Sequence, residues 1–125
     1  MEITDKRVVI TGAASGIGKA LVHAFNKAGA SSVVAVDINA EEVGKVAEKI
    51  DGKAITANVA READIQRVIE EANDYAGGID IFCSNAGIAG VPGFIEMETP
   101  DWQNIWEINV MSHIFAAKHV IPQML

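Results

Sequence analysis

The segment that decides the fold reads Thr11-Gly12-Ala13-Ala14-Ser15-Gly16-Ile17-Gly18. It follows a short apolar run and opens a stretch whose apolar residues recur at helical spacing. The first N–H groups of a helix have no partner within the helix and the helix dipole is positive there, so a pyrophosphate fits this position. Glycine is needed where a Cβ would block the turn or the approach of the phosphates. The segment therefore predicts a dinucleotide-binding loop, although a tight turn without a ligand would also explain it.

Four short runs along the chain are rich in small and branched apolar residues and mostly do not alternate with polar ones. Strands that are buried on both faces have this pattern, as in a parallel sheet. The predicted strands are Arg7–Thr11, Ser32–Asp37, Ala54–Asn58 and Ile79–Asn85.

Helical patterns fill the intervals between these runs. Asn39 and Glu42 form a capping pair that opens the second helix. Thr99, followed by Pro100, is the expected cap of the last helix, and Pro122 is expected to end it. The predicted helices cover residues 16–28, about 40–50, a stretch around 65–72, and about 100 to 119 or 121; the loop predicted over Ile88–Glu98 contains Gly90, Pro92 and Gly93.

Composition excludes several classes of function. The chain has 125 residues and a net charge of −7, which disfavours nucleic acid and anionic membrane surfaces as partners. The N-terminus does not resemble a signal peptide, no apolar run approaches the length that spans a bilayer, and the single cysteine, Cys83, allows no internal disulfide. Together these features lead us to expect a cytoplasmic protein. We expect no metal site, because His113 and His119 are six residues apart and lie on different faces of a helix.

The glycine spacing G-x-x-x-G-x-G after Thr11 resembles the short-chain dehydrogenase/reductase family. Asn85-Ala86-Gly87 is similar to that family's N-N-A-G motif, with Ser84 in place of the first asparagine. Asn109 matches its helix asparagine, and residues 121–124 resemble the segment that closes that helix. The resemblance covers the whole chain.

The alternation of strands and helices implies right-handed crossovers and a parallel sheet covered on both faces. We predict an α/β fold: a three-layer Rossmann-type sheet truncated to about four strands in the order 3-2-1-4, with helices on both faces. Residues 1–125 are expected to form a single, partial domain of this kind.

Asp37 ends the second predicted strand, 19 residues after Gly18. An acid there accepts hydrogen bonds from the adenosine ribose and repels a 2′-phosphate. No Arg or Lys stands at positions 13, 14, 38 or 39, where a phosphate clamp is expected. The cofactor expected from this pattern is NAD rather than NADP. The alternative interpretation of Asp37 is a solvated acid at a strand end without a ligand.

Two further segments complete the expected cofactor site. Asn58-Val59 resembles the family's adenine clasp, and Asn58 keeps a carbonyl acceptor where the family has Asp; an Asx-type turn is the alternative. Residues 85–87 resemble the segment that lines the cofactor ribose, with an ordinary turn as the alternative. The cofactor-binding residues that we expect are Gly12, Ser15, Gly16, Ile17, Gly18, Asp37, Ile38, Asn58, Val59, Asn85, Ala86 and Gly87.

The resemblance implies hydride transfer between NAD(H) and an alcohol or carbonyl substrate, with a serine and a Y-x-x-x-K pair in the catalytic set. The only tyrosine is Tyr75, and Ile79 rather than lysine follows it four residues later. Of that catalytic set only Asn109 is present. Its alternative role is structural, as a buried polar side chain that forms hydrogen bonds with the backbone. We expect the NAD-binding portion of an oxidoreductase, inactive alone; the alternatives are a non-catalytic nucleotide-binding module and an oligomerising scaffold.

We also expect a homo-oligomer. The last predicted helix is apolar around more than one stripe from Ile105 to Ile121, whereas a helix that faces only its own sheet has one apolar face. The helix resembles a helix of the family that packs against the same helix of the neighbouring subunit. The strand at Ile79–Asn85 would be an unpaired apolar edge without proline or lysine. Trp102 and Trp106 are expected in the core or in an interface, and Cys83 as a buried small apolar residue.

Overall fold

The computed structural model describes residues 1–90 and 93–125. Residues 91–92, inside the loop predicted over Ile88–Glu98, lie outside the described residues. The elements are β1 (Arg7–Thr11), α1 (Gly16–Lys27), β2 (Ser32–Asp37), α2 (Ala40–Glu48), β3 (Lys53–Thr56), α3 (Glu62–Ala76), β4 (Ile81–Cys83), α4 (Thr99–Trp106), a π-helical turn (Glu107–Met111) and α5 (Ser112–Met124).

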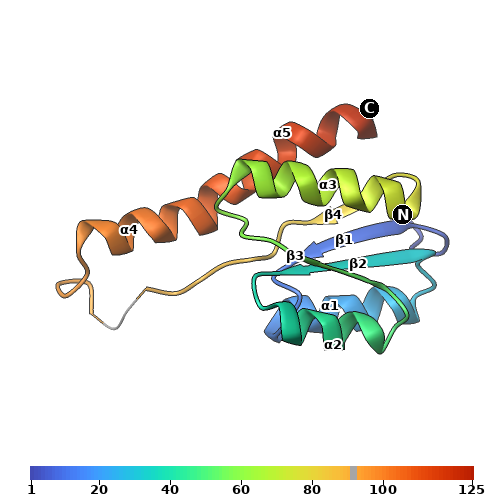
Figure 1. Ribbon diagram of the computed structural model, residues 1–125, viewed down its shortest axis with the longest axis horizontal. Coiled ribbons are helices and arrows are strands. Elements are labelled where there is room, and N and C mark those ends of the chain that lie inside the picture. Colours follow the sequence, from blue (N-terminus) through green and yellow to red (C-terminus); the bar gives the residue numbers. More distant parts are fainter. Residues whose placement is uncertain (91–92) are drawn as a thin grey trace.

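The four strands form one parallel sheet in the order β3-β2-β1-β4, which confirms the predicted order. Helices α1 and α2 cover one face, and α3 and α5 cover the other (Figure 1). Neighbouring residues of β1 point to opposite faces: Val8 packs on the side of α1 and α2, and Val9 packs on the side of α3 and α5. Both faces are apolar, which explains why the strand residues do not alternate with polar ones.

The predicted fourth strand was too long at both ends. Expected over Ile79–Asn85, β4 pairs with β1 only from Ile81 to Cys83. Beyond Cys83 the backbone turns toward the side chain of Thr11, which accepts the N–H groups of the next residues and ends the ladder. Within the described residues β4 has β1 as its only strand partner, so Cys83 is half-buried on an edge strand.

The last predicted helix differs from the expectation in three respects. Glu98 rather than Thr99 is the N-cap, because Glu98 and Asp101 exchange side-chain and backbone hydrogen bonds in a capping box. The helix is interrupted by the π-helical turn Glu107–Met111. Pro122 does not end it: the proline lies within the final turn, and α5 continues to Met124.

Helix α4 extends away from the sheet, whereas α5 lies along α3 (Figure 1). None of the α4 residues is buried, and Trp102 and Trp106 are 43% and 57% exposed. The tryptophans therefore do not belong to the core; Trp102 instead stacks edge-to-face on Phe94, with ring centres 5.1 Å apart. No helix of the described residues is long and apolar enough to cross a membrane.

Candidate functional site

The glycines of the loop between β1 and α1 have different tasks. Gly12 has a φ of +68°, and a Cβ there would lie 2.8 Å from the Cα of Ala86. A Cβ on Gly18 would lie 2.0 Å from the carbonyl oxygen of Gly12, so Gly18 lets the helix start close to the strand. Gly16, with a φ of +53°, has no atom near its missing Cβ and faces open space. Only Gly16 therefore leaves room for a ligand; the other two allow close packing.

Thr11 joins this loop to the segment after β4. Its buried hydroxyl accepts the N–H groups of Asn85 and Ala86 at 3.0 and 3.1 Å and donates to the Cys83 carbonyl at 3.4 Å. Asn85 Nδ2 donates in turn to the Thr11 carbonyl at 3.1 Å. Sequence analysis did not place Thr11 in the site, although a polar residue at the end of an apolar run was a usable signal.

Asp37 lies at the carboxyl end of β2, beside the same loop. Its Oδ2 accepts the Ala14 N–H and its Oδ1 accepts the Asn39 N–H, both at 3.0 Å. Two backbone donors thus fix the direction of the carboxylate. The charge stands where the sequence predicts an acceptor for ribose hydroxyls.

Asn58 follows β3 and is held on several sides. Its N–H donates to Asp64 Oδ2 at 2.8 Å, and its side-chain Oδ1 accepts the Ala60 N–H at 3.0 Å. The second contact is an Asx-type turn, which was the structural alternative for this residue. Asp64 was missed because its role depends on α3 beginning next to the end of β3.

These segments enclose a cleft of about 440 Å³ at the carboxyl ends of the strands. The structure brings together every expected cofactor residue except Gly18, together with Ala57, Ile88 and Ile108, which sequence analysis missed. Ile17 and Ile38 are 73% and 67% exposed at its rim. The lining residues are Gly12, Ser15, Gly16, Ile17, Asp37, Ile38, Ala57, Asn58, Val59, Asn85, Ala86, Gly87, Ile88 and Ile108.

Asn109 does not line the cleft. It lies on the π-helical turn, where its Oδ1 accepts the Ile88 N–H and its Nδ2 donates to the Ile88 carbonyl, both at 2.8 Å. This pairing positions the chain after Gly87 at the edge of the cleft. Its observed contacts are thus those of a polar residue bonded to backbone.

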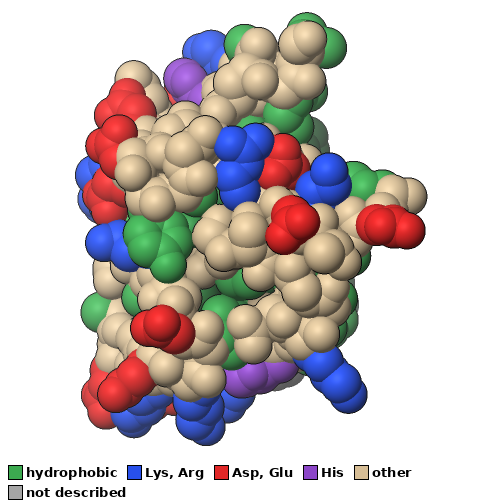
Figure 2. Space-filling model, turned by 90° about the vertical axis from the view of Figure 1, so that its right-hand side faces the viewer, with side chains coloured by type: hydrophobic (Ala, Val, Ile, Leu, Met, Phe, Trp, Pro, Cys, Tyr) green, Lys and Arg blue, Asp and Glu red, His purple; other side chains and the backbone are tan. Residues whose placement is uncertain are grey.

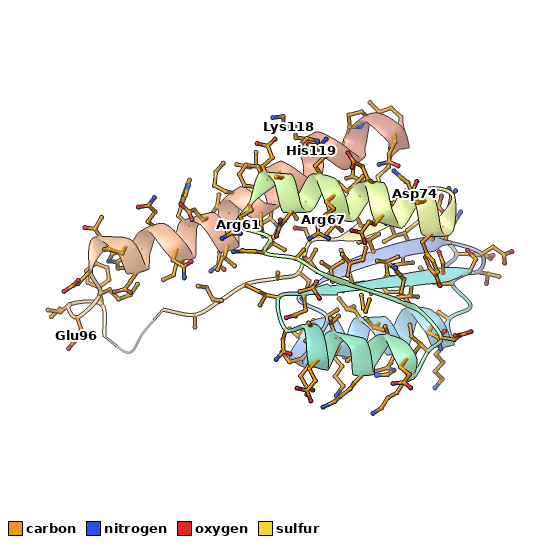
Figure 3. The ribbon with its side chains drawn as sticks, in the orientation of Figure 1. Arg61, Arg67, Asp74, Glu96, Lys118 and His119 are labelled. Atoms are coloured by element: carbon orange, nitrogen blue, oxygen red, sulfur yellow. The ribbon has the colours of Figure 1, made fainter. Side chains whose placement is uncertain are left out.

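The other titratable groups lie elsewhere. Glu62, at the start of α3, accepts from Lys118 and His119 of α5, and these hydrogen bonds hold its pKa below the ordinary value; Figure 3 shows the two labelled side chains above α3. His113 Nδ1 lies 2.6 Å from Ser84 Oγ. Burial raises the pKa of the Cys83 thiol. Among the residues that the structure describes, no group of three or more His, Cys, Asp or Glu could hold a metal ion.

Charges on the outer surface are mixed. In Figure 2, which shows the side of the molecule that carries both termini, basic side chains lie among acidic ones. Tyr75, on α3, is 46% exposed and is not among the residues that line the cleft.

A family model described as short chain dehydrogenase matches residues 6–125. A "CLA biosynthesis dehydrogenase/reductase" from Lactiplantibacillus plantarum is 38% identical over 99% of this chain and 45% of its own length. A 1-deoxy-11-beta-hydroxypentalenate dehydrogenase from Streptomyces exfoliatus is 33% identical over 100% of this chain and 48% of its own length. The chain spans about half the length of the curated relatives it matches.

Solved structures agree with this similarity. A 3-ketoacyl-(acyl-carrier-protein) reductase from Brucella melitensis, complexed with NADH, superposes with a TM-score of 0.93 and 32% identity, over 97% of this chain and 51% of that one. A short chain dehydrogenase/reductase from Burkholderia phymatum, in complex with NAD, has a TM-score of 0.95 at 24% identity, over 100% of this chain and 46% of that one. The second likeness shows the fold alone.

Proposed function

Because the chain belongs to the short chain dehydrogenase family, we propose that its cleft binds NAD(H) as the cofactor-binding portion of an oxidoreductase. The observation that carries this proposal is the cleft itself, in which the start of α1, the carboxylate of Asp37 and the segment 85–87 meet. NAD supplies a nicotinamide ring that accepts or donates a hydride when bound. The related reductase from Brucella melitensis that was solved with NADH supports this choice of cofactor.

The residues present fit the parts of a dinucleotide. Ser15 caps α1 with no side-chain hydrogen bond to the helix, so its hydroxyl and the first N–H groups of α1 suit a pyrophosphate. Gly16 leaves the approach open. Ile17 and Ile38 are large apolar side chains exposed at the rim, and a bound ligand would cover them.

The reaction that we propose for the whole protein is hydride transfer between NAD(H) and an alcohol or carbonyl substrate. In that reaction Asn109 would hold the position of the family's helix asparagine and position the Ile88 backbone. The 125 residues contain no Y-x-x-x-K sequence. We therefore propose that this chain alone binds the cofactor without catalysing turnover.

Besides cofactor binding, the exposed apolar surface of the chain favours association between copies of it. The edge strand β4 and the outer side of α5 carry apolar residues, of which Ile114 and Ile121 are 50% and 47% exposed. We propose that copies of the chain associate through α5, through the β4 edge, or through both.

Cofactor binding is tested with two matched glycine variants. Gly16 and Gly77 both have a left-handed φ and open space at the missing Cβ, but only Gly16 lines the cleft. Gly16→Ala and Gly77→Ala therefore carry a similar backbone strain, whereas only the first places a methyl group in the path of the phosphates. We expect calorimetric titration to show saturable NAD binding that Gly16→Ala weakens about tenfold or more and Gly77→Ala leaves unchanged. Equal effects of the two variants would contradict the proposal.

A further inference from the structure

Ser112 is a buried polar residue at the end of the π-helical turn. It begins α5, it is 2% exposed, and its hydroxyl donates to the carbonyl of Ile108 at 2.6 Å. In a regular α-helix the backbone N–H of Ser112 would donate to that same carbonyl, four residues back. Here this N–H is directed at the carbonyls of Glu107 and Val110. The side-chain hydroxyl therefore makes the contact that the backbone N–H has given up.

The π-helical turn sets the direction in which Asn109 points. Such a turn holds more residues than an α-helical one, and one added residue rotates the helix before it by about 100° relative to the helix after it. The position of α5 is fixed, because Ala116 and Val120 are buried against α3 and the sheet. A return to α-helical bonding would therefore turn the side chain of Asn109 toward another face.

In its observed direction Asn109 holds the edge of the cleft. Its Oδ1 accepts the Ile88 N–H and its Nδ2 donates to the Ile88 carbonyl, both at 2.8 Å. The fit is close, since a Cβ on Gly87 would lie 3.3 Å from Asn109 Oδ1. Gly87, Ile88 and Ile108 all line the cleft. A rotation of Asn109 would release the backbone at this wall of the cleft.

We propose that Ser112 is a positioning residue for the cleft: its hydroxyl holds the π-helical turn that directs Asn109 to Ile88. Ser112 does not line the cleft, so it affects a ligand only through Asn109. The effect on the cofactor rests on the proposed NAD(H) binding. The effect on the backbone of Ile88 needs no ligand, and the two are measured separately.

The first measurement uses the chain without ligand. Ser112→Ala removes the hydroxyl and keeps a residue that favours the helix. In nuclear magnetic resonance spectra of the ¹⁵N-labelled chain, the Ile88 amide resonance reports whether Asn109 Oδ1 still accepts its proton. Asn109→Ala gives the position of this resonance when that acceptor is removed. We expect Ser112→Ala to move the resonance most of the way toward that position.

The second measurement is the dissociation constant for NAD, obtained by calorimetric titration of Ser112→Ala, Asn109→Ala and the double variant. Each single substitution should weaken binding by about threefold to tenfold, the range that one lost hydrogen-bonding contact produces. Because Ser112 acts through Asn109, the double variant should bind NAD no more weakly than Asn109→Ala alone. Two independent residues would have additive effects instead.

Val120→Ala is the matched control. Val120 is 4% exposed on the same helix, and its truncation removes buried apolar contacts without changing a group of the π-helical turn. It should lower the unfolding temperature at least as much as Ser112→Ala and leave the Ile88 resonance and the affinity for NAD unchanged. If Ser112→Ala does not fold, Ser112→Cys, which has only a weak donor, takes its place in both measurements.

Three outcomes overturn the inference. The first is an Ile88 resonance that Asn109→Ala moves and Ser112→Ala does not. The second is an equal movement of that resonance in Val120→Ala, and the third is a double variant in which the two losses of affinity add. If the unmodified chain binds no NAD, the proposed function falls, and the Ile88 resonance alone decides whether Ser112 positions Asn109.

Discussion

Asp37 has a carboxylate whose two oxygens each accept a backbone N–H, one from Ala14 and one from Asn39. The side chain therefore cannot swing away from a ligand without giving up these contacts. A 2′-phosphate at the end of β2 would meet a fixed charge of the same sign in a partly shielded cleft. No Lys or Arg is among the described residues that line the cleft, so nothing there compensates.

We predict that the chain binds NAD at least tenfold more tightly than NADP, a gap of about 1.4 kcal/mol or more, and that Asp37→Ala narrows this gap. The reason is that the substitution removes both the ribose acceptor and the repulsion. Titration of both nucleotides checks the prediction, with Asp74→Ala on the exposed surface of α3 as the control. Equal affinities of the unmodified chain for NAD and NADP would rule it out.

Residues whose role follows from backbone geometry could be predicted from the sequence. Gly12, Gly16 and Asp37 stand at strand ends and helix starts, and the structure places them together in the cleft. The place of Thr11 at the end of an apolar run was a usable signal, but the N–H groups that Thr11 and Asp64 accept could not be predicted, because only the folded chain brings them near. Which end of Asn58 faces the loop likewise depends on Ala60.

At the scale of helices and strands, the type of each element could be predicted from the sequence, but the residues at which several elements end could not. β1 and β2 have the predicted bounds, since their apolar runs are paired along their whole length. β4 is shorter because hydrogen bonds to Thr11 replace the strand ladder after Cys83. The π-helical turn at Glu107–Met111 was not predicted, because the last helix is apolar around more than one stripe and a local shift of its periodicity does not stand out in the sequence.

The start of β4 is joined to the start of β1 by one ion pair. Arg7 donates from Nε to Asp80 Oδ2 and from Nη2 to Oδ1, both at 2.8 Å, and its backbone N–H also donates to Oδ2 at 2.9 Å. Hydrogen bonds from Arg7 hold the pKa of the Asp80 carboxyl well below its ordinary value. The pair therefore links an edge strand to the centre of the sheet.

We predict that Asp80→Asn lowers the unfolding temperature at pH 7 by about 4 °C, the shift that roughly 1 kcal/mol produces in a domain of this size. Because the pKa of Asp80 is lowered by folding, its contribution is complete above the unfolded-state pKa of about 4 and is lost as the pH falls below it. The difference between the variant and the unmodified chain should therefore shrink progressively as the pH falls below about 4, and it should vanish only below the pKa of Asp80 in the folded chain. Thermal unfolding between pH 3 and pH 7 measures this, with Asp74→Asn as the control; a difference that is independent of pH would contradict it.

At the scale of the whole molecule, the strand order followed from the alternation of strands and helices and from the loop that opens α1. What the sequence did not indicate is how far α4 extends from the sheet, because its apolar residues are typical of a packed helix. The structure leaves Trp102 and Trp106 exposed and Ile105 half-buried. The large apolar side chains that are exposed outside the cleft include Phe94, Ile95, Trp102, Trp106, Ile114, Ile121, Met124 and Leu125.

We predict that the chain is not a monomer at working concentration. Burial of these side chains at about 25 cal/mol per Å² would offset the cost of association. Sedimentation over a hundredfold dilution from high micromolar protein should show species larger than 13.3 kDa, and the charged substitution Ile121→Lys on the outer side of α5 should weaken them if the helix is the contact. A single 13.3 kDa species throughout would exclude association.

We also predict no oxidoreductase turnover from this chain alone. The catalytic set that the family resemblance implies includes a tyrosine paired with a lysine, and the only tyrosine of the 125 residues, Tyr75, does not line the cleft. The assay follows NADH formation with a panel of alcohols, using protein free of host enzymes. Steady NADH formation would show that the catalytic groups have been assigned wrongly.

The most direct test of the cleft is a map of the backbone amides that respond to NAD. In a nuclear magnetic resonance titration of the ¹⁵N-labelled chain, the largest saturable shifts should fall on Ser15–Ile17 at the start of α1, on Ile38, on Val59, and on residues 86–87, all of which line the cleft. Amides of the Gly77 turn and of the outer side of α5 should not respond. Absence of any saturable shift at millimolar NAD, or shifts confined to the side of α5 and β4, would contradict NAD binding in the cleft.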